Sequence, residues 1–211
     1  MPQRKNRRPR HNPRIKRVKA LPDRNLWKTH NFVAGIDEAG RGPLAGPVVA
    51  AAVVLPRNYY HPDIKDSKQL SAKKRALLYR VIIQRALCYA FGIVEPAVID
   101  EINILRATKR AMSHAVAQLS LKPEIILIDA LTLSDIAIPQ QPLIKGDTLS
   151  ISIAAASILA KVKRDTIMEE YHSTYPQYHF NRHKGYPTRL HRRCIQRHGP
   201  CPIHRKSFRL L

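Results

Sequence analysis

Apolar residues gather in short segments whose length and content of Val, Ile and Ala are typical of buried strands. Two of these segments are apolar and then end at acidic residues. The strands predicted in this way are 32–37, 43–55, 88–94, 124–129 and 142–145.

Longer segments between these strands have helical spacing or helix-starting residues. Ser71 is a favourable N-cap, Pro96 suits a first helical position, and the small residues 154–157 permit close packing. The predicted helices are 71–86, 96–119, 150–172 and 188–197. Early strands followed by strands that alternate with helices predict an α/β sheet with helices on its faces.

The charge of the chain is strongly positive and unevenly distributed. Lys and Arg number 37 against 15 Asp and Glu, a formal net charge of +22 over 211 residues. Residues 1–30 hold 11 of these cations and one acid, and residues 171–211 hold nine and no acid. This excess predicts a polyanionic partner, either nucleic acid or an anionic membrane surface.

The two basic ends differ in composition. Residues 1–20 contain three prolines and few apolar anchors, so we expect residues 1–28 to form a basic disordered arm. Residues 29–211 are expected to form one folded domain, in which the aromatic-rich end, about 171–211, is a helical extension. The longest apolar run, 48–55, is too short to span a bilayer, and the first 30 residues contain no apolar block of signal-peptide type. With three cysteines as well, the sequence predicts a cytoplasmic protein without a membrane partner.

Carboxylates follow the predicted strands. Asp37 and Glu38 end the first strand, Asp129 ends the fourth, and Asp147 follows the short fifth. Each acid alone is explained as a turn or capping residue. Three such positions in so basic a chain favour a site for Mg²⁺ or Mn²⁺, because clustered carboxylates repel each other unless a cation neutralises them. A carboxylate–metal cluster within a basic surface is the combination that cuts a phosphodiester.

A glycine-rich turn follows these first acids. Gly40, Gly42 and Gly46 resemble a dinucleotide fingerprint only loosely, since the spacing is one residue too long and a strand, not a helix, is predicted next. The better interpretation is a tight turn whose backbone approaches a ligand closely.

Seven motifs, taken together, resemble the type 2 ribonuclease H family, the bacterial ribonucleases HII. They cover residues 31–208 in the expected order, and none corresponds to residues 1–28. The motifs are VAGIDEAGRGPLAGPVV (33–49), DSKQLS (66–71), ILIDAL (126–131), IKGD (144–147), AAASILAKVKRD (154–165), HKGYPT (183–188) and HGPCPIHRKSF (198–208).

The resemblance implies a ribonuclease H-like mixed sheet flanked by helices, with a C-terminal helical extension. It implies an endonuclease that cuts the RNA strand of RNA–DNA hybrids and incises 5′ to single ribonucleotides in duplex DNA, leaving 3′-hydroxyl and 5′-phosphate ends. The family's catalytic and metal-binding acids fall on Asp37, Glu38, Asp129 and Asp147, and two Mn²⁺ or Mg²⁺ ions are implied during catalysis. Asp165 is a tempting alternative as the fourth acid, but the family's acid matches the Lys-Gly-Asp position.

The resemblance also implies substrate-binding residues. The family's Gly-Arg-Gly turn falls on Gly40, Arg41 and Gly42, and its stacking tyrosine on Tyr186. Contacts with phosphates are expected from the lysines of three motifs, although a solvated surface role is as good an explanation for each. These lysines are Lys68, Lys161 and Lys184.

Two alternatives belong to other classes of protein. The run His191, Cys194, His198, Cys201 and His204 has the density of a zinc site, but no separated ligand pair closes a recognisable finger. A basic RNA- or ribosome-binding protein without catalysis would explain the charged ends, yet it would gain nothing from carboxylates beside phosphates. We expect a monomer, and we find no convincing motif for binding a sliding clamp.

Overall fold

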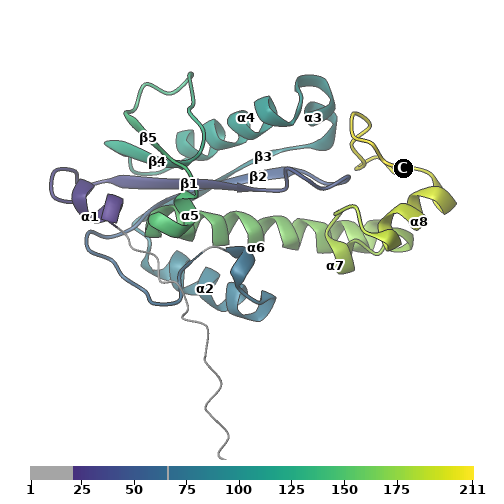
Figure 1. Ribbon diagram of the computed structural model, residues 1–211, viewed down its shortest axis with the longest axis horizontal. Helices are drawn as coiled ribbons and strands as arrows, with labels where there is room; N and C mark the ends of the chain where they lie inside the picture. Colours follow the sequence, from purple (N-terminus) through teal and green to yellow (C-terminus); the bar gives the residue numbers. More distant parts are fainter. Residues whose placement is uncertain (1–20, 66) are drawn as a thin grey trace, which may run out of the picture.

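The computed structural model describes residues 21–65 and 67–211, and its centre is a mixed five-stranded sheet in the order β3-β2-β1-β4-β5 (Figure 1). β1, β2 and β3 form an antiparallel meander, while β4 and β5 run parallel to β1. The strands are β1 (Val33–Ala39), β2 (Val48–Val54), β3 (Cys88–Val94), β4 (Ile125–Asp129) and β5 (Gln140–Leu143).

Helices cover both faces of this sheet (Figure 1). The long helix α6 packs against β1 and β2 on one face with α2 beneath it, and α4 packs against β2 and β3 on the other. The helices are α1 (Leu21–Leu26), α2 (Ala72–Arg85), α3 (Pro96–Ile102), α4 (Ile104–Ala117), α5 (Gly146–Leu149), α6 (Ile151–Thr174), α7 (Phe180–His183) and α8 (Arg189–His198), with short 3-10 turns η1 (Ser67–Gln69) and η2 (Pro176–Tyr178).

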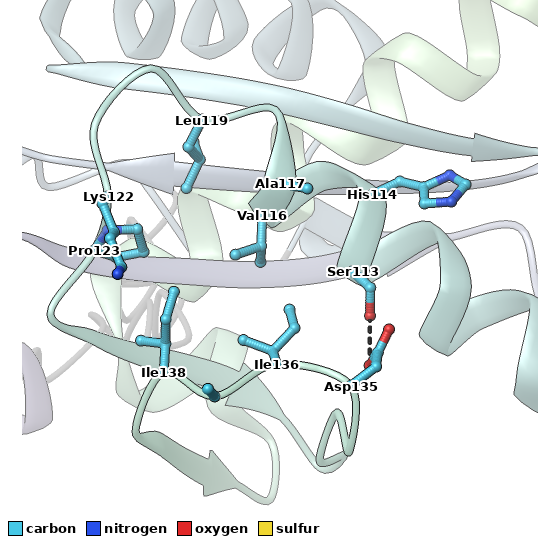
Figure 2. A pocket seen from close by; sticks show the side chains of 11 residues that line it. Ser113, His114, Val116, Ala117, Leu119, Lys122, Pro123, Asp135, Ile136 and Ile138 are labelled. Atoms are coloured by element: carbon cyan, nitrogen blue, oxygen red, sulfur yellow. Dashed lines mark hydrogen bonds between the residues drawn. The ribbon is translucent and has the colours of Figure 1, made fainter.

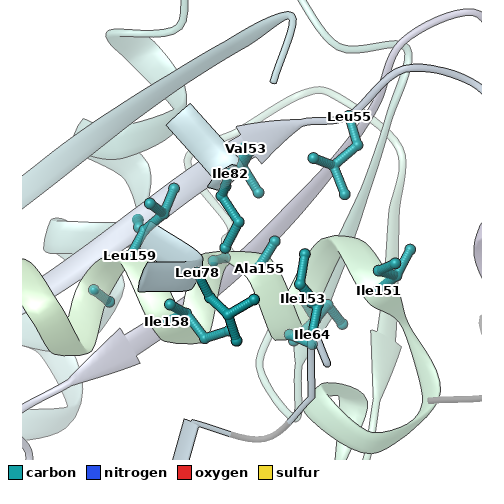
Figure 3. Packing of buried hydrophobic residues seen from close by; sticks show 14 of the residues in the cluster. Val53, Leu55, Ile64, Leu78, Ile82, Ile151, Ile153, Ala155, Ile158 and Leu159 are labelled. Atoms are coloured by element: carbon teal, nitrogen blue, oxygen red, sulfur yellow. The ribbon is translucent and has the colours of Figure 1, made fainter. Parts of the chain in front are cut away.

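Alternating side chains of the central strands fill two separate apolar layers. Val33, Ala51 and Val53 face α6, whereas their neighbours Ala34 and Ala52 face α4. Figure 3 shows the first layer, in which Ile and Leu side chains of α2 and α6 meet β2. β2 and most of β1 are therefore apolar, because both faces of the sheet are buried along these central strands.

Two glycines allow these helices to approach closely. A Cβ added to Gly35 on β1 would collide with the backbone of Ser152 on α6, and one added to Gly92 on β3 would collide with the backbone of Ala111 on α4. The position of α6 relative to the end of β1 thus depends on the missing side chain of Gly35.

The structure corrects two predicted elements. The predicted helix 96–119 is broken at Asn103, whose φ of 68° ends α3 and whose side chain caps the N-terminus of α4. The predicted strand 43–55 begins only at Val48, because the preceding residues form a loop that bonds to the C-terminal segment. The predicted strand 88–94 is confirmed, and so is Ser71 as the N-cap of α2.

The predicted boundary of the basic arm is also wrong. Residues 21–26 form α1, and Trp27 is only 2% exposed in the layer beneath α6. The buried carboxylate of Asp23 accepts hydrogen bonds from the Ser150 hydroxyl and from the N–H groups of Ile151 and Ser152, so it caps the N-terminus of α6. Residues 21–28 therefore belong to the folded domain, and the rest of the predicted arm lies outside the described residues.

The C-terminal region is helical and has its own small core. Tyr178 and Phe180 stack at 5.4 Å between ring centroids and pack with Met168 of α6 and Cys194 of α8. Within residues 21–65 and 67–211, no helix combines the length and apolar composition that a membrane span requires.

Candidate functional site

The predicted acids meet at one edge of the sheet. The parallel register pairs Ile36 with Ile128, so Asp37 and Asp129 come next on adjacent strands. Asp147 lies in α5, directly after Gly146, whose N–H donates to Asp129 Oδ1 at 2.8 Å. The structure thus brings together acids from three separate parts of the chain.

Asp37 lies on the face of β1 that α6 covers, and its partners come from that side. Asp37 Oδ1 accepts the N–H of Glu38 at 2.7 Å, and the carboxylate also hydrogen-bonds the Ser157 hydroxyl of α6. Ser157 in turn lies 2.9 Å from the hydroxyl of Ser67. The first acid is therefore held by a buried chain of hydroxyl groups.

The carboxylates raise one another's pKa values. Burial, followed by the charges of Glu38 and Asp129, raises the pKa of Asp37 well above its ordinary range. Burial also raises the pKa of Glu38; the Arg41 guanidinium opposes this effect and the charge of Asp129 adds to it. The ionised cluster is costly by itself, which is the condition that a bound cation relieves.

The chemistry of these donors fits Mg²⁺ or Mn²⁺, since all are carboxylate oxygens. Glu38 Oε1 points to Arg41 Nη1 at 3.4 Å, and Asp129 is bonded to the N–H of Gly146. Among the described residues, no three His, Cys, Asp or Glu side chains lie close enough together in this arrangement to hold one ion. If the acidic side chains turn toward a bound cation, the residues that would hold it are Asp37, Glu38, Asp129 and Asp147.

A cavity of about 530 Å³ opens beside Glu38. It brings the glycine-rich turn together with residues from η1, α6 and the loop before α8. Most of the predicted substrate-binding residues line it, namely Gly40, Arg41, Gly42, Lys68, Lys161 and Tyr186, together with Ser67 and Ser157.

The two lysines near Tyr186 have different surroundings. Lys161 Nζ lies 2.7 Å from Asp165 Oδ1 and 5.5 Å from the centroid of the Tyr186 ring. Lys184 Nζ instead bonds Glu169 at 2.9 Å and lines a neighbouring groove of about 630 Å³ between α2 and α6. The structure therefore separates the Lys184 side chain from the cavity, and its phosphate contact stays a prediction. Asp165 acts as the partner of Lys161 and lies outside the carboxylate cluster.

Another cavity, of about 470 Å³, lies between the end of α4 and the loop that joins β4 to β5 (Figure 2). Its walls are largely apolar, and Ser113 donates a hydrogen bond to Asp135 at 2.9 Å within it. None of the predicted site residues lines this cavity, so it is not the centre of the chemistry.

Two of the histidines considered as zinc ligands, His191 and His204, bond each other. The N–H of Cys201 donates to His204 Nδ1 at 2.9 Å, so the proton of His204 is on Nε2, which faces His191 Nε2 at 3.1 Å. His191 then carries its proton on Nδ1 and donates it to the carbonyl of Tyr186 at 3.0 Å. This neutral chain runs from the C-terminal segment to the residue predicted to stack on substrate.

Sequence reasoning did not single out Ser157, Arg164 or Arg205. The signal for the first two is the spacing of positions 157, 161 and 164, which share one face of α6. On a helix with so many small and apolar residues, polar side chains at these positions must find partners in the interior. No comparable pattern marks Arg205, because it lies in irregular backbone.

The chain resembles known proteins over most of its length. The family model described as "Ribonuclease HII" matches residues 34–211. The chain belongs to the ribonuclease HII family. It is 59% identical over 181 residues to a ribonuclease HII of Syntrophus aciditrophicus, covering 86% of this chain and 85% of the relative, and 52% identical over 197 residues to one of Caldanaerobacter subterraneus, covering 92% and 82%.

The fold of the ribonuclease HII family is shared with solved structures. The ribonuclease H2 of Pyrococcus horikoshii is 28% identical and superposes with a TM-score of 0.70 over 85% of this chain and 94% of that protein. The mixed sheet with flanking helices and a helical C-terminal region is thus confirmed as ribonuclease H-like. The chain is a ribonuclease H, an endonuclease that hydrolyses the RNA strand of RNA–DNA hybrids.

Proposed function

We propose that this ribonuclease incises duplex DNA 5′ to a single embedded ribonucleotide as well as cutting continuous hybrids, and that it leaves 3′-hydroxyl and 5′-phosphate ends. The observation that carries the proposal is the carboxylate cluster of Asp37, Glu38 and Asp129 beside a cavity lined by the glycine-rich turn and Tyr186. Charge repulsion within the cluster favours cations, and the cavity offers contacts to a sugar and its phosphates.

Four acids are proposed to hold two Mn²⁺ or Mg²⁺ ions. Asp37, Glu38 and Asp129 are the direct ligands, and Asp147 assists the second ion or the attacking water. Bound at these acids, two such ions would supply an activated water and would stabilise the leaving 3′-oxygen. Ser157 keeps the Asp37 carboxylate in place, and the N–H of Gly146 does the same for Asp129.

Recognition of the ribonucleotide is proposed for the opposite wall of the cavity. Gly40, Arg41 and Gly42 contact the 2′-hydroxyl, which separates RNA from DNA, and the flanking phosphates. Tyr186 is 40% exposed, so part of its ring is accessible for stacking on the sugar beyond the ribonucleotide. Lys68 and Lys161 contact phosphates at the same cavity, and Lys184 contacts a phosphate in the adjoining groove. The protein is proposed to act as a cytoplasmic monomer.

The test is an incision assay on a duplex that carries one ribonucleotide, with Mn²⁺ or Mg²⁺ and with an all-DNA duplex beside it. Asp129→Asn should abolish incision, whereas Asp135→Asn, which changes an exposed aspartate bonded to Ser113, should leave it unchanged. Cleavage of a continuous hybrid without incision at the lone ribonucleotide would contradict the proposal. A binding protein without catalysis would cut neither substrate.

A further inference from the structure

Two arginines lie fully buried behind the glycine-rich turn. Arg164 on α6 and Arg205 in the C-terminal segment are both 0% exposed. Among the described residues, no carboxylate lies within ion-pair distance of either guanidinium. Burying a cation without a countercharge is costly, so these side chains need another set of partners.

Their partners are backbone carbonyls of one loop. Arg205 Nη2 donates to Gly40 O at 2.6 Å and to Gly46 O at 2.8 Å, and Nη1 donates to Arg41 O at 3.1 Å. Arg205 Nε donates to Gly46 O at 3.0 Å, and the backbone N–H of Arg205 donates to Leu44 O at 2.8 Å. A single side chain therefore holds both ends of the turn.

Arg164 joins the same loop to the segment of Tyr186. Its Nε donates to Pro47 O at 3.0 Å and its Nη2 to Ala45 O at 3.1 Å, while Nη1 donates to Lys184 O at 3.0 Å. The guanidinium carbon lies 5.8 Å from the centroid of the Tyr186 ring. The two walls of the cavity are thus tied together through Arg164.

These bonds fix the direction in which the turn presents its N–H groups. In a planar trans peptide the N–H points opposite to the C=O. Because the carbonyls of Gly40 and Arg41 point to Arg205, the N–H groups of Arg41 and Gly42 point away from it. Gly40, Arg41 and Gly42 line the cavity, and Arg205 does not.

The charges persist at neutral pH. Burial lowers the pKa of Arg164 to about 10, and burial together with the charge of Arg164 lowers that of Arg205 to about 9. Both guanidinium groups therefore stay cationic near pH 7 and add positive potential beneath a site that must accept phosphates.

We propose that Arg164 and Arg205 are positioning residues for ribonucleotide recognition, which orient the peptides of the Gly40–Pro47 loop so that successive N–H groups face the substrate at a fixed distance from Tyr186. This inference rests on the function proposed above. It predicts that the arginines control how well the protein distinguishes a ribonucleotide from a deoxyribonucleotide, beyond their contribution to folding.

The test measures binding, without turnover, in an Asp129→Asn background. Dissociation constants are determined for a duplex with one ribonucleotide and for the same duplex made of DNA alone, and their ratio is compared. Arg205→Lys keeps the charge but cannot reach three carbonyls in a fork. We expect the preference for the ribonucleotide duplex to fall about tenfold, with little change in binding of the DNA duplex.

Arg192→Lys is the matched control, because Arg192 Nη1 also donates to a backbone carbonyl, that of Leu210, at 2.7 Å, but does not touch the loop. It should leave the ratio unchanged. If Arg205→Lys does not fold, Phe208→Leu replaces it, since the Phe208 ring lies 5.0 Å from the Arg205 guanidinium and its loss should shift the ratio in the same direction.

Three outcomes separate the two proposals. No preference for the ribonucleotide duplex in the background protein itself overturns the proposed function. A preference that persists unchanged in Arg205→Lys, or in Phe208→Leu, overturns the positioning role alone. A parallel loss of affinity for both duplexes together with a lower melting temperature would show that the arginines only support the fold.

Discussion

The hydroxyl of Ser157 lies 2.9 Å from the hydroxyl of Ser67, and Ser157 also hydrogen-bonds the carboxylate of Asp37. Ser67 is the first residue of η1, Ser157 lies in the second turn of α6, and Asp37 lies on β1. The acid at the end of β1 is therefore fixed by two other elements, and its charge remains next to those of Glu38 and Asp129.

Replacing Asp37 by Asn should abolish cleavage and raise the stability of the metal-free protein. The substitution removes one of the mutually repelling charges and keeps an oxygen that accepts hydrogen bonds. Urea unfolding in EDTA at neutral pH should show a gain of about 1–2 kcal/mol. A gain of the same size for the exposed Asp135→Asn, or undiminished turnover by Asp37→Asn, would contradict the assignment.

Replacing Tyr186 by Ala should weaken incision at a lone ribonucleotide more than cutting of continuous hybrids. An aromatic platform under a base or sugar contributes about 1–3 kcal/mol, and a continuous hybrid offers other contacts. The two rates and the melting temperature are measured together. Tyr60→Ala serves as the control, because this exposed tyrosine lies outside the cavity. A parallel fall of both rates and of the melting temperature would instead indicate a core role for Tyr186.

Replacing Asp23 by Ala should destabilise the domain by about 2–4 kcal/mol. The change removes the carboxylate that accepts hydrogen bonds from the Ser150 hydroxyl and from the N–H groups of Ile151 and Ser152. These N–H groups at the start of α6 then have no carboxylate acceptor. Asp23→Asn keeps one acceptor oxygen and should cost less. Equal melting temperatures for Asp23→Ala and the unchanged protein would show that α1 is not needed to hold α6.

The histidine chain predicts that stability falls in acid. Burial, together with the neighbouring histidines, lowers the pKa of His183 and of His191 to about 4. Between pH 6.5 and 4 the unfolded chain binds more protons than the folded one. The contribution of these histidines to the free energy of unfolding is therefore complete above pH 6.5 and decreases as the pH falls toward 4. The loss is about 3 kcal/mol for one such histidine. Unfolding measured from pH 4 to 8 should be flatter for His191→Asn than for the control His114→Asn, and equal curves would refute the effect.

The basic arm is predicted to strengthen binding to any nucleic acid through its charges. Residues 1–20 carry nine Lys and Arg and no acid. If about four of these charges meet phosphates, a chain that begins at Leu21 should show a salt slope of log K smaller by about 3.6, with little change in turnover at saturating substrate. Titrations of a hybrid duplex at several salt concentrations measure this slope. Parallel slopes for the two chains would show that the arm does not bind nucleic acid through its charges. A chain that begins at Thr29 would also lose Asp23 and Trp27 and should be less stable.

Much of the sheet was predictable because its central strands β1, β2 and β4 are buried on both faces and so have nearly continuous apolar sequences. The carboxylates stood out for the same reason, since Asp37 and Asp129 interrupt those runs at matching positions. The break at Asn103 was not predictable from apolar spacing, because α3 and α4 continue the same pattern while the backbone turns at a single left-handed residue.

Other features depend on contacts between distant parts of the chain. In sequence, residues 21–28 resemble the rest of the basic end. Only the folded structure shows that Asp23 caps the start of α6 and that Trp27 is buried in the core. Arg205 resembles any surface arginine in sequence, and only the folded C-terminal segment places it behind Gly40 and Gly46. The Lys184 side chain likewise turns toward Glu169 because α6 presents that acid beside it.

Helix α6 determines the distances between the parts of the site. Its start is capped by Asp23, and Ser157, Lys161 and Arg164 then meet Asp37, the cavity and the loop in turn. The seven helical steps from Ser157 to Arg164 span about 10 Å, and each added or deleted residue would rotate everything beyond it by about 100°. Insertions can accumulate in the loops of such a protein. The length of this stretch of α6 must stay constant, however, if the acids and the glycine-rich turn are to contact the same nucleotide.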